Sequence, residues 1–178
     1  MCAWNGHGLR GSMLEDIINR TNESYRIKRL GVIQKIPTPI TPVEMNKKRQ
    51  ITLAYFDMKS TVDYIGTVQG IPVCFDAKEC ATDTFPLQNI HEHQIRFMHD
   101  FEEQSGVAFL IVYYTVRDEM YYLPFRDIYS FWQRMEKGGR KSFRYEEIDK
   151  SYKINRKGEF LCHYLETLDT DLKTRKTL

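Results

Sequence analysis

The amino-acid sequence predicts an α/β domain in which helices flank a mixed central sheet and an arm projects from it. Three observations carry this prediction. Helical and strand-like periodicities alternate along the 178 residues, eight consecutive apolar residues have the length of a strand covered on both faces, and three prolines within six residues interrupt the pattern. A single domain over residues 1–178 accommodates these elements, because a chain of this length buries one core.

The first elements along the chain are a helix and a short strand. Ser12 and Glu15 form a capping box, in which a hydroxyl and a carboxylate three residues later satisfy the free amides of a helix start. Apolar residues then recur at helical spacing, so we expect a helix over residues 12–29. Residues 31–36 have the composition of a strand.

An arm is predicted next, over about residues 37–50. Pro37, Pro39 and Pro42 lack an amide donor, so this segment fits neither a helix interior nor a central strand and should be extended and projecting. It leads directly into three consecutive basic residues, which we expect at its tip and in contact with DNA phosphates: Lys47, Lys48 and Arg49.

The remaining elements follow the same reasoning. We expect residues 51–56 to return to the body as a strand, and a two-residue turn at Gln69-Gly70 to join two further strands. The expected later elements are strands at 61–68, 71–78, 107–114 and 120–123 and helices at 87–104 and 125–135. We expect the polar end, residues 169–178, to be disordered.

Composition narrows the class of protein without identifying a partner. The net charge is only +2, but seven basic residues and a single acid lie between residues 26 and 50, and a second basic cluster lies between residues 134 and 144. This segregation fits either a basic face presented to a polyanion or basic loops in solvent. Four scattered cysteines form no C-x-x-C pair, and no apolar run is long enough to span a bilayer, so we expect a cytoplasmic protein without a membrane partner.

The hairpin at residues 61–78 carries the main functional argument. If Gln69-Gly70 is a two-residue turn, the two residue numbers of every facing pair in the hairpin add up to the same value. This rule places Asp63 opposite Asp76 and Thr61 opposite Lys78. Opposed carboxylates destabilise a sheet unless a positive charge lies between them. A hard divalent cation is the obvious candidate, and we expect Mg²⁺, with Mn²⁺ as a substitute.

These residues suffice for phosphodiester hydrolysis. The cation would polarise a phosphoryl oxygen and activate water, while Lys78 would neutralise charge in the transition state. A D-x-K triplet also occurs by chance as an exposed ion pair, and it is the opposed Asp63 that favours catalysis. Gln94 interrupts the apolar stripe of its helix and should point inward, either as a satisfied core amide or as a companion of the metal through its carbonyl or a bridging water.

A zinc site is a weaker alternative. His91, His93 and His99 are the candidate ligands, but we expect His91 and His93 to point to different sides of a helix and to be solvated.

Several motifs resemble the RecU Holliday junction resolvases of Gram-positive bacteria and some of their phages. The motifs are TVDYIG at residues 61–66, FDAKE at 75–79, FPLQNIHEHQ at 85–94, PTP at 37–39, FW at 131–132 and GRKS at 139–142. The resemblance runs in order over nearly the whole chain. The string at 85–94 is far more specific than the D-x-K triplet.

The resemblance implies a restriction-endonuclease-like fold in an intertwined homodimer that nicks two strands of a four-way DNA junction symmetrically, with the arm as a stalk inserted at the junction centre. It implies metal-site roles for Thr61, Asp63, Asp76 and Gln94, stabilisation of the transition state by Lys78, and DNA handling by Arg10. A recombinase is a further candidate partner.

Two features depart from the family pattern. The family usually has Glu where this chain has Asp76, and the segment before Ser12 is short.

The candidate site and the resemblance together predict a structure-selective, Mg²⁺-dependent endonuclease that resolves four-way junctions in recombination and repair. The alternatives are a non-catalytic junction-binding or strand-annealing protein and a duplex endonuclease of restriction type.

Overall fold

A six-stranded mixed sheet organises the chain, in the order β1-β4-β5-β7-β8-β10. The computed structural model describes residues 13–56 and 61–175. The six strands are β1 (Val32–Lys35), β4 (Tyr64–Val68), β5 (Ile71–Cys80), β7 (Val107–Tyr114), β8 (Glu119–Pro124) and β10 (Lys153–Ile154). β5 and β7 are parallel and the other neighbours are antiparallel, which confirms the mixed sheet predicted from the sequence.

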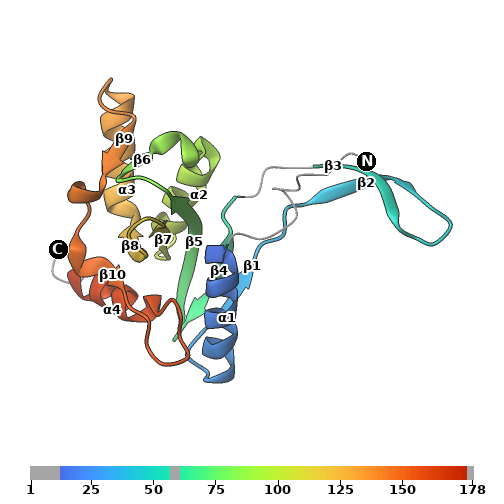
Figure 1. Ribbon diagram of the computed structural model, residues 1–178, viewed down its shortest axis with the longest axis horizontal. Helices are drawn as coiled ribbons and strands as arrows, with labels where there is room; N and C mark the ends of the chain where they lie inside the picture. Colours follow the sequence, from blue (N-terminus) through green and yellow to red (C-terminus); the bar gives the residue numbers. More distant parts are fainter. Residues whose placement is uncertain (1–12, 57–60, 176–178) are drawn as a thin grey trace.

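Helices cover both faces of this sheet (Figure 1). α1 (Met13–Ile27) and α4 (Tyr164–Arg175) pack on one face, and α2 (Glu92–Glu103) and α3 (Phe125–Glu136) pack on the other. All eight residues of β7 are buried, as their continuous apolar run predicts for a strand covered on both sides. The helix α2 lies between β5 and β7 in the chain and provides the crossover that two parallel strands require.

Short elements extend the α2–α3 side. β6 (Thr84–Pro86) pairs with β9 (Ser142–Arg144), and three 3₁₀ turns follow the strands: η1 (Leu87–Asn89), η2 (Tyr145–Glu147) and η3 (Lys150–Tyr152). The helix expected from residue 87 therefore begins at Glu92, after the η1 turn.

The arm is longer than the sequence analysis expected. β2 (Ile40–Met45) and β3 (Ile51–Phe56) pair with each other and not with the central sheet, and Figure 1 shows this ribbon projecting away from the body. The strand expected at residues 51–56 is present as β3, but it pairs with β2 in the arm and not with the central sheet. Pro42 fits here, since each strand of a two-stranded ribbon has an open edge that needs no amide donor.

The C-terminal segment is also different from the expectation. Residues 169–175 are not disordered but form the second half of α4, and residues 176–178 lie outside the described part. The helix is held because Asp171 is fully buried and bonded to Tyr122 on β8 and Arg126 on α3. In the part of the chain that is described, no helix has the length and apolar character that crossing a membrane requires.

Candidate active site

The β4–β5 hairpin has the register that the two-residue turn predicts. Val68 pairs with Ile71 and Tyr64 pairs with Phe75, without a bulge. Gly66 keeps this register because it lies against β1, where a Cβ atom would come within 2.2 Å of the Val32 carbonyl oxygen. The absence of a side chain at this position therefore lets β1 and β4 approach each other.

The two aspartates meet immediately beyond the last ladder pair. The Asp63 backbone N–H donates to Asp76 Oδ1 at 3.1 Å, and the Ala77 backbone N–H donates to Asp63 Oδ2 at 3.0 Å. Each carboxylate is therefore held by the backbone of the opposite segment. This exchange brings Asp63 and Asp76 together, as the hairpin arithmetic predicts.

Asp76 is fully buried and has three polar neighbours. Besides the Asp63 amide, its Oδ1 accepts a hydrogen bond from Gln94 Nε2 at 3.0 Å. Its Oδ2 lies 2.5 Å from Lys78 Nζ as an ion pair, but no described group donates a well-directed hydrogen bond to this oxygen. One lone-pair direction of a buried carboxylate is thus left for a cation.

Burial raises the pKa of Asp76 to about 7. Lys78 lowers it and the neighbouring Asp63 carboxylate raises it further. A carboxyl with this pKa sits between its neutral and charged forms near neutral pH. A divalent cation at the free oxygen would favour the charged form, which is the behaviour expected of a ligand in a preformed site.

Gln94 points inward, but its carbonyl is already engaged. Its Oε1 accepts the backbone N–H of His91 at 3.0 Å, while its Nε2 faces Asp76. The orientation of the amide is fixed because the His91 N–H can only donate and the Asp76 carboxylate accepts. In this arrangement Gln94 orients Asp76, and its carbonyl does not face the carboxylates.

The histidine prediction needs a correction. His91 is the residue before α2, not part of the helix, and its ring stacks on that of His93 with centroids 5.3 Å apart and planes 13° apart. The two rings therefore lie together and do not point to different sides. With Thr61, Glu92 and Arg96 they line an open pocket of about 460 Å³, whose lining does not include Asp63, Asp76 or Lys78.

The donor set of this site fits a hard divalent cation. The Asp63 and Asp76 carboxylates supply oxygen atoms, which Mg²⁺ prefers over nitrogen or sulfur. Asp76 Oδ2 gives further support, because this buried oxygen pairs with Lys78 but receives no well-directed hydrogen bond from the described residues, so it has room for a second cation.

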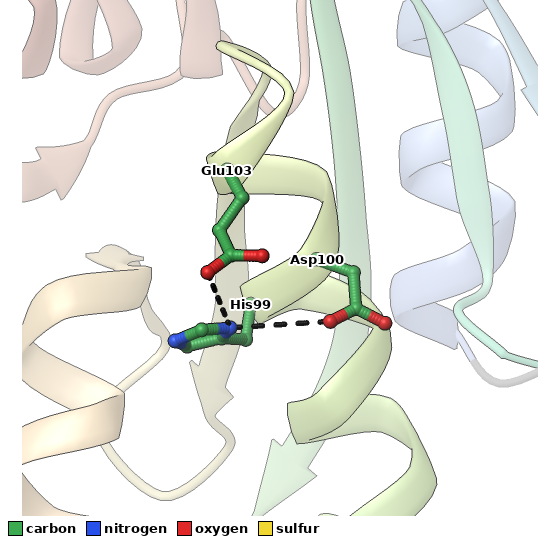
Figure 2. A group of neighbouring side chains, drawn as sticks. All are labelled: His99, Asp100 and Glu103. Atoms are coloured by element: carbon green, nitrogen blue, oxygen red, sulfur yellow. Dashed lines mark ion pairs between the residues drawn. The ribbon is translucent and has the colours of Figure 1, made fainter.

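A second acidic group lies on the outer surface of α2. Figure 2 shows His99 with Asp100 and Glu103, and each carboxylate is 3.9 Å from the same imidazole nitrogen, Nδ1. All three side chains are at least 42% exposed. These are the contacts of a solvated helix surface, so we assign no metal to this group.

The predicted DNA-contacting residues lie at the end of the arm. Lys47, Lys48 and Arg49 are exposed in the turn between β2 and β3. The Asn46 carboxamide oxygen accepts the backbone N–H groups of Lys48 and Gln50, which gives this turn a defined shape. Arg10 lies outside the described residues.

Several contacts at the site could not be read from the sequence. The Ala77 amide that holds Asp63 is a backbone group, and the N-cap position of His91 depends on where the helix starts. Glu79, next to Lys78, accepts the backbone N–H of Leu14 at 3.0 Å and attaches the start of α1 to β5. In the sequence, the position of Glu79 directly after the D-x-K triplet was the one feature that could have pointed to a role at this site.

Comparisons with known proteins give a consistent result. Residues 9–170 match the family RecU, Recombination protein U. A protein named Holliday junction resolvase RecU from Leuconostoc mesenteroides is 40% identical over 172 residues, covering 93% of this chain and 83% of the relative. The Bacillus subtilis protein of the same name is 40% identical over 147 residues, covering 80% and 70%.

A solved structure gives a much weaker match. Hjc of Archaeoglobus fulgidus, a Holliday junction resolvase, has a TM-score of 0.35 at 7% identity, covering 63% of this chain and 75% of that one. A likeness at this level carries no argument about fold or function.

Proposed function

The chain belongs to the RecU family, and from this we propose that it is a Holliday junction resolvase, an endonuclease that nicks four-way DNA junctions in recombination and repair. The single observation that supports catalysis most strongly is the fully buried Asp76, bonded to Asp63 and Gln94 and paired with Lys78. A protein that only binds junctions has no use for a buried carboxylate held beside a second carboxylate and a lysine.

The proposed cofactor is Mg²⁺, with Mn²⁺ as a substitute. Asp63 and Asp76 would hold it, with the Thr61 hydroxyl as a further ligand and Gln94 acting through Asp76 or a bridging water. When bound, the ion polarises a phosphoryl oxygen and lowers the pKa of the attacking water. This assignment is supported by the oxygen donors at the site and by the Asp76 Oδ2 atom.

The chain's own residues have separate tasks in this reaction. Gln94 and the Asp63 amide fix the orientation of the Asp76 carboxylate. Lys78 is 21% exposed, so its ammonium group can turn from Asp76 toward a bound phosphate and stabilise the negative charge that develops there. When Lys78 turns toward the phosphate, the Asp76 carboxylate becomes available to the cation.

We propose a homodimer as the active form, because symmetric nicking needs two sites. Support comes from large apolar side chains that remain about half exposed along the arm: Ile40, Val43, Met45, Ile51, Leu53 and Tyr55. A two-stranded ribbon that exposes so many apolar groups is marginal on its own and is typical of a surface that meets a partner. The proposed compartment is the cytoplasm, and a recombinase is a further proposed partner.

The test of this function is cleavage of a labelled four-way junction beside a linear duplex of the same sequence, with Mg²⁺ or with EDTA. We expect symmetric nicks in the junction with Mg²⁺, none with EDTA, and little cutting of the duplex. Tight binding without metal-dependent nicking would support a binding protein instead, and equal cutting of both substrates would support a duplex endonuclease.

A further inference from the structure

A basic loop joins α3 to β9, on the side of the molecule that carries β6 and α2. It consists of residues 137–141, Lys-Gly-Gly-Arg-Lys, and all five are exposed. The predicted catalytic and arm functions make no use of it. Its shape, its attachment and its charge together identify what it binds.

The loop has a fixed backbone shape. Gly138 adopts φ +83°, and its N–H and that of Gly139 close the end of α3 by donating to the carbonyls of Met135 and Arg134, both at 2.9 Å. A Cβ atom on Gly139 would come within 2.7 Å of the Arg134 carbonyl oxygen. Both glycines are therefore needed, and the side chains of Lys137 and Lys141 start from defined positions.

The loop is attached to the segment that leads into the active site. The Leu87 N–H donates to the Lys141 carbonyl at 3.0 Å, and the next residue, Ser142, pairs with Pro86. Four residues further along the chain is His91, whose amide bonds Gln94 beside Asp76. Four residues span at most about 14 Å, and the η1 turn shortens this distance, so Leu87 lies within about one major-groove width of His91.

The loop has positive charge that acids of the protein do not neutralise. Glu147 pairs with Arg134 at 2.5 Å and with Arg140 at 3.1 Å. Neither Lys137 nor Lys141 takes part in any of the ion pairs found among residues 13–56 and 61–175. Lys137 also lies at the carboxyl end of α3, where a cation is favourable, but no such structural reason exists for Lys141.

We propose that Lys137 and Lys141 bind the phosphate backbone of the duplex arm whose strand enters the active site. The inference rests on the proposed function, since it takes junction DNA as the ligand. A strand with its phosphate at Asp76 and Lys78 would continue past the N-terminus of α2, and the basic loop, attached to that path through Leu87, carries two lysines outside the ion pairs of the described residues. The loop holds duplex, whereas the tip of the projecting arm contacts the crossover.

The test compares Lys137→Ala/Lys141→Ala with wild type by fluorescence anisotropy in Ca²⁺, using both a linear duplex and a four-way junction over a salt series. Two lost phosphate contacts should lower the slope of log K against log salt by about 1.8 and weaken both substrates about tenfold at 0.1 M salt. Lys137→Arg/Lys141→Arg should restore binding, because charge rather than shape is the cause.

A matched control removes the same charge elsewhere. Lys28→Ala/Lys157→Ala replaces two exposed lysines that pair with Glu159 and Glu166, and it should bind like wild type. Unchanged duplex affinity and salt slope in the loop variant would overturn the proposal, as would a loss confined to the junction. Because the readout is binding to plain duplex, a failure of the nicking assay leaves this test interpretable.

Discussion

At the scale of single residues, the site is organised around one buried carboxylate. Asp76 lies on β5 with Lys78 two residues away on the same face, and Asp63 and Gln94 approach it from the neighbouring segment and from α2. The Asp63 amide and Gln94 donate hydrogen bonds to Oδ1, whereas Oδ2 is supported by the ion pair with Lys78 and receives no well-directed hydrogen bond from the described residues. The energetic cost of burying the other oxygen is the reason that a cation should bind here.

Asp76→Ala should abolish metal-dependent nicking while four-way junction binding stays within about twofold of wild type. The change removes a metal ligand from a buried position and leaves the DNA-contacting surface intact. Gel-shift titration in Ca²⁺ and cleavage in Mg²⁺ measure the two effects separately. Asp100→Ala, in the exposed group of Figure 2, is the control and should nick normally. Equal loss in both variants would contradict the assignment of the site.

The raised pKa of Asp76 predicts how stability depends on pH. With a folded-state value of about 7 against an ordinary value of 3.8, the folded protein binds more protons than the unfolded chain between these limits. The stability that this group contributes is therefore greatest below about pH 4, falls as the pH rises from about 4 to about 7, and changes no further above the folded-state pKa. Asp76→Asn cannot lose a proton and escapes this fall.

In EDTA at pH 8, Asp76→Asn should therefore unfold at a higher urea concentration than wild type, and the difference should disappear near pH 4. Mg²⁺ should narrow the gap at pH 8, because only wild type gains from binding the ion. Urea midpoints at the two pH values provide the measurement. A variant that is less stable than wild type at pH 8 in EDTA would show that Asp76 is satisfied without a metal.

At the scale of elements, the hairpin was the most predictable part of the chain. A two-residue turn and a side-chain period of two determine the register, so Asp63 and Asp76 could be paired from residue numbers alone. The inward position of Gln94 followed from helical periodicity in the same way. Both inferences use local sequence rules that the tertiary structure has no reason to override.

Elements that depend on distant partners were not predictable. Residues 51–56 have a strand pattern, but nothing in that pattern shows that they pair with β2 and not with the sheet. The polar residues at 169–175 look unsuited to a core, yet Asp171 is buried because Arg126, 45 positions earlier, neutralises it. The stacking of His91 on His93 depends on α2 starting at Glu92, and helix starts are the least certain feature of a sequence.

The arm predicts a selective effect on junctions. Lys47→Ala/Lys48→Ala should weaken junction binding and lower its salt slope by about 1.8, since two phosphate contacts are lost. Linear duplex binding should change much less, because the arm tip lies away from the helices and sheet (Figure 1). Salt titrations on both substrates measure this, with Lys28→Ala/Lys157→Ala as the charge-matched control. Equal weakening on both substrates would contradict a role at the crossover.

At the scale of the whole molecule, β5 lies between two apolar cores. One core is covered by α1 and α4, and the other by α2 and α3. α4 connects these parts: Arg175 pairs with Glu102 of α2 at 2.5 Å, and Asp171 bonds Tyr122 of β8 and Arg126 of α3. The polar end of the chain thus acts as an anchor across the sheet. The contacts of this segment should therefore contribute to the free energy of unfolding of the whole domain, even though the segment is far from Asp76 in sequence.

Asp171→Ala should lower the free energy of unfolding by about 3 kcal/mol, because it leaves the partly buried Arg126 and Arg175 without their shared carboxylate. Asp169→Ala, two residues earlier, is the matched control. Its carboxylate is 61% exposed and pairs only with Lys173 on the same helix, so the expected change is within about 0.5 kcal/mol. Urea unfolding followed by circular dichroism separates the two variants. If both are as stable as wild type, residues 169–175 contribute nothing to the fold and the anchor does not exist.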